Sequence, residues 1–286
     1  MSGEKGEKNR FKTNNRVVLS VFESLSNFID DDNIATMREE YELIDLLFNL
    51  KQFHIQGLPL RWLAQHGRII NHGKQKKIDK IQFDFGGKRK FIFEPEHLAL
   101  TSGMKFGLMP EVEADIDSQF MSLFPEDLEK LKFSDVLKLL HAHSDTPIKK
   151  KTTIVRKLVV VYLIYKLVFH KDPKNKINYR IVILADDKDK FNAFPWGRMV
   201  YDQIVSNWAH VFERAKVPPV GEVQLKIESF PFAIQCWFLE GLTPTQYFSL
   251  AEKVDDEAIP RIYRWTTRSN PDYPAADRLM FNHDQV

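Results

Sequence analysis

KFNAFPWGRMVYDQIVSNWAH, residues 190–210, joins a cluster of large side chains to an amphipathic helix. Pro195 suits the first turn of that helix, because the N–H that proline lacks would have no partner there. Phe194 can form part of a hydrophobic staple, and Trp196 offers a large apolar surface whose indole N–H needs an acceptor. We interpret the stretch as a fold-defining corner rather than as a ligand site. Its signature residues are Phe191, Phe194, Pro195, Trp196, Gly197 and Arg198.

The bulk composition indicates a folded, intracellular protein. A net charge of +2 is too small to attract nucleic acid or a membrane, so binding to either would need a local patch. The single cysteine, Cys236, excludes an internal disulfide. Residues 1–15 are polar and basic and lack the apolar stretch of a secretory signal, so we expect a disordered basic tail and a reducing compartment. The most apolar run, residues 155–169, contains three cations and is too short to cross a bilayer, so no membrane association is expected.

Hydrophobic periodicity predicts mostly helices. The helical patterns cover residues 16–29, 33–53, 57–70, 134–143 and 155–169, a segment between Pro95 and Gly103, and the stretch after the corner. Ser134 is the expected cap of its helix. Two alternating runs around Gly86-Gly87 predict a hairpin over residues 80–93. Short strands are expected at residues 180–185 and 223–227.

These elements together predict a helix-dominated α+β fold with a small antiparallel sheet that includes the hairpin near 80–93. No long linker divides the chain, so we expect a single compact domain over residues 16–268. Residues 269–286 are expected to form an irregular C-terminal tail.

Several residues invite a catalytic or metal-binding interpretation. Cys236 would need a neighbouring histidine to act as a nucleophile, but its apolar surroundings favour a buried core thiol. His141 and His143 would diverge on a helix, so a solvated helix end is favoured over a metal site. We predict no catalytic residue, no metal site and no cofactor. We also expect no metal site at the acidic turn formed by Asp186, Asp187 and Asp189. This turn lacks the glycine and the closing glutamate of a calcium loop.

A basic cluster near residues 149–157 is the candidate for nucleic-acid contact. Its cations could neutralise phosphates, or they could be a solvated start of the following helix. The cluster consists of Lys149, Lys150, Lys151, Arg156 and Lys157.

Three segments together resemble a plant domain of unknown function found in Mutator-like transposable elements. The segments are FDFGGKRKFIFEPEHLALTSGMKFG, ILADDKDKFNAFPWGRMVYDQI and IESFPFAIQCWFLEGL, and IPRIYRWTT is similar to a later piece. The third segment adds Phe230, Pro231 and Trp237 to the signature. Ser229 stands where the family often has glycine, and Cys236 occupies a usually aliphatic position.

What this resemblance implies is limited, because the family brings no established activity and no catalytic residues. The domain commonly sits upstream of a SUMO-protease-like cysteine peptidase, whose nucleophile segment this chain lacks. We therefore expect a non-enzymatic, transposon-derived module that binds another protein or nucleic acid. The alternative is a fragment of such a peptidase polyprotein without its catalytic domain. An element relic without a selected role also stays open. By analogy with transposon proteins we expect the protein in the nucleus, and without that analogy in the cytoplasm. The sequence says nothing of oligomeric state.

Overall fold

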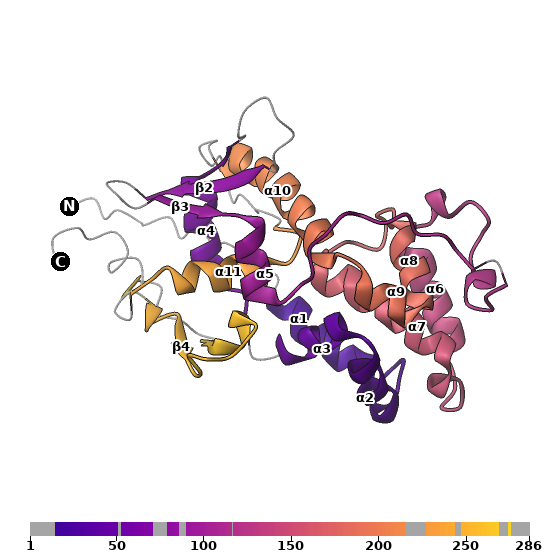
Figure 1. Cartoon of the computed structure of the whole chain (residues 1–286). Helices are drawn as coiled ribbons and strands as arrows, with labels where there is room; N and C mark the ends of the chain where they lie inside the picture. Colours follow the sequence, from indigo (N-terminus) through magenta and orange to yellow (C-terminus); the bar gives the residue numbers. More distant parts are fainter. Residues whose placement is uncertain are drawn as a thin grey trace, which may run out of the picture.

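The aromatic corner leads directly into the longest helix of the chain, α10 (Trp196–Ala215). The computed structural model describes residues 15–50, 53–70, 79–85, 90–115, 117–215, 227–243, 247–268 and 274–275. In α10 the apolar residues at three- and four-residue spacing are all buried, as the sequence predicts, namely Val200, Ile204, Trp208 and Val211. The buried face of α10 lies against the sheet and the helices around it (Figure 1).

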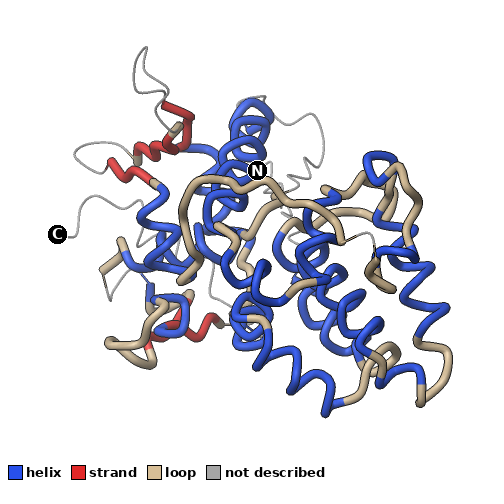
Figure 2. The backbone as a smooth tube through the Cα atoms, turned by 45° about the vertical axis from the view of Figure 1, so that its right-hand side comes forward, coloured by secondary structure: helices blue, strands red, loops and turns tan. Residues whose placement is uncertain are grey.

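Helices dominate the described part of the chain, and the strands lie at one end of it (Figure 2). The helices besides α10 are α1 (Asn15–Leu25), α2 (Asp31–Glu40), α3 (Glu42–Asn49), α4 (Gly57–His66), α5 (Pro95–Ser102), α6 (Phe133–His143), α7 (Thr153–Leu163), α8 (Tyr179–Asp186), α9 (Lys188–Ala193) and α11 (Pro231–Glu240). The strands are β1 (Gly67–Ile70), β2 (Lys80–Asp84), β3 (Lys90–Phe93), β4 (Ala251–Lys253) and β5 (Trp265–Thr267).

The expected hairpin forms the centre of an antiparallel sheet with the order β1-β2-β3. Ile81 pairs with Phe93 across the hairpin, while Gly86 and Gly87 lie outside the described residues. Phe83 of β2 points to the core, with its ring centroid 6.0 Å from Trp208 of α10 and 5.4 Å from Trp237 of α11. The sheet therefore packs on the same helices that carry the signature residues.

A second group of helices, α6 to α9, lies on the other side of the molecule (Figure 1). Its centre is α7, which is continued by a π-helical turn over Ile164–Val168. Every side chain from Leu158 to Leu163 is buried, which confirms the expected core helix. One continuous hydrophobic core includes residues of α1, the sheet, α7, α10 and β5.

The fold class is confirmed: the chain has a helix-dominated α+β fold with a small antiparallel sheet. No described helix has both the length and the apolar character needed to span a bilayer.

Four element predictions are wrong. The helix expected over 33–53 is two helices, because Tyr41 leaves the helical region with φ −127° and ψ 102°. The strand expected at 180–185 is helix α8, which Asn178 caps by accepting from the backbone N–H of Arg180. The helix expected over 57–70 ends at His66, where β1 follows. Ser134 is not a cap, because α6 begins one residue earlier, at Phe133.

One further region differs from the expectation, and three expected segments lie largely outside the described residues. Residues 251–267, for which the sequence pattern predicts no strand, contain the antiparallel pair β4-β5. Most of the strand expected at 223–227, nearly all of the basic tail 1–15 and most of 269–286 lie outside the described residues.

Candidate interaction groove

The corner is a closed unit of buried aromatic rings. Trp196 donates its indole N–H to the backbone carbonyl of Phe191 at 2.8 Å, which supplies the acceptor that a buried tryptophan needs. The ring centroids of Phe191 and Phe194 lie 4.7 Å and 5.0 Å from the Trp196 ring. Pro195 precedes the first residue of α10, close to the first-turn position expected for it. These contacts hold the backbone between α9 and α10 in one conformation.

Gly197 allows another part of the chain to approach the corner closely. Its backbone N–H donates to the carbonyl of Lys105 at 2.8 Å. A Cβ atom at Gly197 would lie 2.3 Å from the ring of Phe106 and 2.9 Å from the Lys105 oxygen, so the position has no room for one. Lys105 also contacts Glu42 of α3 and the carbonyl of Asn192, at 2.8 Å and 3.0 Å. The corner thus anchors the segment that follows α5.

That segment, Phe106 to Ala114, runs from α5 across the helices α8 and α9 (Figure 1). Within the part of the chain that the structure describes, none of its backbone groups makes a hydrogen bond. Its last residues alternate in exposure with period two, as in a strand. Val112 and Ala114 pack towards the core, whereas Glu111 and Glu113 are exposed. We call residues 106–114 the open segment.

A groove with a volume of about 510 Å³ separates the open segment from the corner. Its apolar lining comes from both sides, with Leu108, Pro110 and Val112 on one and Phe194 and Pro195 on the other. We call it the corner groove. A polar hollow of about 410 Å³ adjoins it and shares Glu113 and Lys190 with it.

The corner groove has charged groups at its polar end. Asp187 caps α9: the backbone N–H groups of Lys190 and Asp189 donate to its carboxylate, and these hydrogen bonds hold its pKa below the ordinary value. Asp186 forms a largely buried ion pair with Lys157 at 2.7 Å. The acidic turn noted in the sequence therefore serves as a helix cap and an ion pair.

The carboxylates of the neighbouring loop have no cationic partner, although Asp115 accepts from the backbone N–H of Asp117 at 3.1 Å. In the described part of the chain, no cation lies within ion-pair distance of Glu111, Glu113, Asp115 or Asp117. This leaves a negative edge beside the apolar groove.

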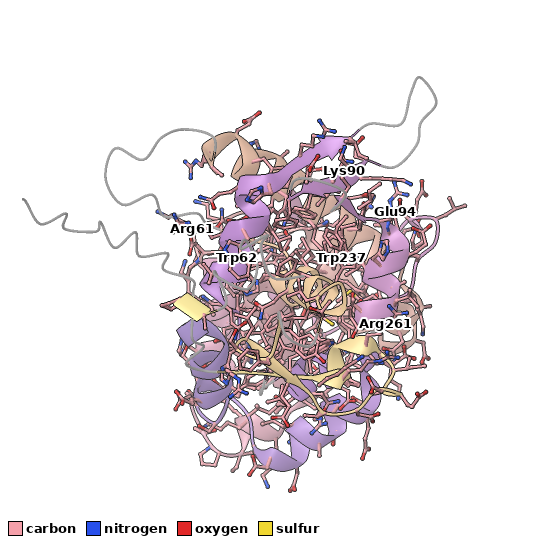
Figure 3. The ribbon with its side chains drawn as sticks, turned by 90° about the vertical axis from the view of Figure 1, so that its left-hand side faces the viewer. Arg61, Trp62, Lys90, Glu94, Trp237 and Arg261 are labelled. Atoms are coloured by element: carbon pink, nitrogen blue, oxygen red, sulfur yellow. The ribbon has the colours of Figure 1, made fainter. Side chains whose placement is uncertain are left out.

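Arg198 lies in α10, where it pairs with Asp202 at 2.9 Å, and the remaining signature residues lie in and around α11. Phe230 and Pro231 begin that helix, and Trp237 packs against β2 and β3; Figure 3 draws it between Trp62 of α4 and Glu94 at the start of α5. Glu240, at the end of α11, accepts from the indole N–H of Trp265 at 2.7 Å. Arg261 also approaches Glu240, at 3.8 Å, so the third and fourth resembling segments meet here.

The basic cluster is bound to its own chain. Lys149 pairs with Asp145 at 3.0 Å, Lys150 donates to the Ser26 carbonyl at 2.8 Å, and Lys151 lies 3.6 Å from Asp30. Arg156 donates to the side chain of Asn33, and Lys157 donates to the carboxylate of Asp186. A nucleic-acid phosphate would have to compete with these contacts. The predicted contact remains a prediction.

The structure does not bring the candidate catalytic residues together. Cys236 is fully buried in α11, and burial raises the pKa of its thiol well above the ordinary value. His141 packs its ring 5.0 Å from that of Phe28, and His143 lies two residues further along α6. Among the described residues there is no cluster of three histidine, cysteine or carboxylate side chains suited to a metal ion.

Sequence reasoning located one side of the groove and missed the other. It singled out Phe194, Pro195 and the acidic turn, but it assigned residues 108–115 to no element and no site. The missed signal is the alternation in Glu111-Val112-Glu113-Ala114-Asp115, where every second residue is acidic. Comparisons of the chain with protein-family models, with curated proteins and with solved structures find no match, so the groove stands on its own geometry.

Proposed function

We propose that this chain is a non-enzymatic interaction module and that the corner groove binds a segment of another protein. The observation that carries the proposal is the combination of an apolar groove with an exposed apolar side chain at its edge. The side chain of Leu108 is 95 % exposed, next to a groove that already has apolar walls. Apolar grooves with a few charged groups at the edge are typical of peptide-binding sites.

The partner chemistry favours protein over nucleic acid. Among the described residues that line the groove, two carboxylates, Glu111 and Glu113, face one cation, Lys190, a balance that disfavours phosphates. The cations of the basic cluster all have partners within the chain. The resemblance to a domain of Mutator-like elements supports a module without catalytic machinery of its own. A transposable-element origin and a former fusion to a SUMO-protease-like peptidase are part of this proposal.

The test is a selection of peptides from a random display library on the full chain. We expect enriched peptides whose binding is lost in two groove variants, Leu108→Asp and Ala193→Trp. Ala193 is exposed at the end of α9 and lines the groove, so a tryptophan there would fill it.

The matched control is Ile148→Asp, which places the same charge at an 83 % exposed apolar residue outside the groove. Its binding should equal that of the wild type. Circular dichroism checks that all variants are folded. If no peptide is enriched, or if enriched peptides bind the groove variants as well as the wild type, the proposal is wrong.

A further inference from the structure

The open segment offers a backbone edge without a partner. Backbone N–H and C=O groups are strong donors and acceptors, and an extended stretch that leaves them unpaired can take up another strand. The last backbone–backbone hydrogen bond before the segment is from Gly197 to Lys105, and the next after it is from Ser118 to Asp115, whose carboxylate also accepts from the backbone N–H of Asp117. The contacts of Lys105 and the inward side chains of Val112 and Ala114 hold the stretch in place between these points.

The edge also has a defined position relative to the groove. Leu108, Pro110 and Val112 line the corner groove, and Glu113 lines the polar hollow that continues it. A peptide lying along the groove would therefore run beside the open segment over its length. Main-chain pairing of this kind supplies affinity, and the pockets for alternate side chains supply specificity.

The charge on the segment selects the partner. The side chains of Glu111, Glu113 and Asp115 are exposed, and no cation in the described residues lies within ion-pair distance of them; Lys190 lines the same groove but pairs with Asp187. They recur at every second residue, so they lie on one face of the extended chain. Opposite charges placed across from each other on neighbouring strands stabilise the pair, and like charges destabilise it.

Apolar contacts would position the partner at the other end of the open segment, away from the carboxylates. Leu108 is 95 % exposed and Met109 is 37 % exposed, and the groove wall beside them is formed by Phe194 and Pro195. An apolar residue of the partner would lie here, while basic residues would lie further along, opposite the carboxylates.

From these observations we infer that the partner is an extended peptide with alternating basic and apolar residues, which adds as a strand along Phe106–Ala114. The inference rests on the proposed function and states the chemistry and pairing mode of the partner. Lysine or arginine side chains of the peptide face Glu111, Glu113 and Asp115, and its backbone pairs with the open segment except at Pro110, which has no N–H to donate.

The test uses the full chain labelled with ¹⁵N and a synthetic, acetylated and amidated nine-residue peptide of alternating valine and lysine. Amide signals of the open segment should shift on titration. The matched peptide carries N-methyl groups at alternate residues, which keep its charge but block strand pairing. We expect at least a tenfold weaker affinity for the N-methylated peptide, since it loses several backbone hydrogen bonds at once.

A charge variant tests the second element of the inference. The triple substitution Glu111→Gln, Glu113→Gln and Asp115→Asn should weaken binding about tenfold at low salt and less at high salt. The matched control, Glu252→Gln with Glu257→Gln, removes two exposed carboxylates far along the chain and should leave the affinity unchanged.

The outcomes separate this inference from the proposed function. Equal binding of the N-methylated peptide, or of a valine–glutamate peptide, overturns strand addition of a basic peptide. Failure of the valine–lysine peptide to bind also overturns it, while library peptides blocked by Ala193→Trp would still uphold the groove. Shifts at Lys149–Lys151 caused by duplex DNA, without any in the open segment on adding peptide, would overturn the inference in favour of nucleic acid.

Discussion

Ser229 and Phe230 enter α11 with positive φ angles of 68° and 44°, a conformation that costs energy for residues other than glycine. The Ser229 hydroxyl is also buried, without a hydrogen-bond partner in the described part of the chain. A glycine at position 229 would avoid both the strain and the unsatisfied hydroxyl at that residue, whereas Phe230 would keep its positive φ.

Replacing this serine should stabilise the protein. We expect Ser229→Gly to raise the free energy of unfolding by about 1 kcal/mol, because it relieves backbone strain and removes an unsatisfied hydroxyl. Urea denaturation measures the change. Ser206→Gly, at an exposed position within α10, is the control and should lower stability by about 0.5–1 kcal/mol. A Ser229→Gly protein no more stable than the wild type would contradict this account.

Gly197 acts through the Cβ atom it lacks. We expect Gly197→Ala to lower the free energy of unfolding by about 1–3 kcal/mol, because the new methyl group would overlap the Phe106 ring and the Lys105 carbonyl. Gly107→Ala is the matched control, since a Cβ there would meet Pro195 only at an ordinary 3.7 Å. Denaturant unfolding measures the free energy of unfolding of both variants. If the two substitutions lowered it equally, the close approach at Gly197 would not be the cause.

The interpretation of Cys236 as a nucleophile can be tested directly. Because its thiol is buried and its pKa is raised by burial, little thiolate forms, and we expect no reaction with a thiol reagent in the native state. Full reaction should appear once denaturant is added, which mass spectrometry can follow. Rapid labelling of the folded protein would reopen the interpretation of Cys236 as a nucleophile.

At the scale of elements, α9 owes its start to Asp187, whose carboxylate accepts two backbone N–H groups. At neutral pH, Asp187→Ala should lower the free energy of unfolding by about 1 kcal/mol, the usual effect of losing an N-cap. The pKa of Asp187 in the folded state lies below the ordinary 3.8, so the contribution of its carboxylate is present above that pH and is lost as the pH falls through the folded value.

The pH dependence checks this assignment. Urea unfolding at about pH 7, 5 and 3 should show the difference between Asp187→Ala and wild type narrowing only at the lowest pH. Asp189→Ala, which removes a neighbouring exposed carboxylate without a capping role, should change stability by less than about 0.5 kcal/mol. A difference that stays constant down to pH 3 would exclude a contribution from the charged cap.

Elements with strong local signals were predictable from the sequence, and those set by tertiary contacts were not. The hairpin, α5 and α10 follow from glycine, proline and apolar spacing. The break at Tyr41 has no local cause: its hydroxyl donates to the Ala185 carbonyl at 3.2 Å and its ring meets Phe191 at 5.0 Å, so packing overrides the helical pattern. The run at 180–185 is apolar throughout, and such runs do not distinguish a buried strand from a buried helix.

For a similar reason, only one wall of the groove was predictable from the sequence. The corner is visible because its residues are contiguous in the chain. The opposite wall comes from a distant segment held by tertiary contacts, among them the backbone hydrogen bond from Gly197 to Lys105, and no spacing rule connects residue 105 to residue 197.

At the scale of the whole molecule, one hydrophobic core joins both groups of helices. We therefore expect a single cooperative unfolding transition over the predicted domain, residues 16–268. Urea curves followed by tryptophan fluorescence and by far-ultraviolet circular dichroism should coincide. Two separated transitions would instead indicate two independently folding units.

Two buried glutamines join distant parts of the sequence. Gln235 of α11 accepts from the backbone N–H of Gln56 at 2.8 Å, and Gln56 donates to the carbonyls of Leu250 and Arg268 at 2.7 Å and 3.0 Å. Amides hidden from water must keep every such partner. A truncation that removed residues 250–268 would strand the Gln56 carboxamide in an apolar interior. Shortened variants, fusions and circular permutants of this protein should therefore retain the chain through Arg268.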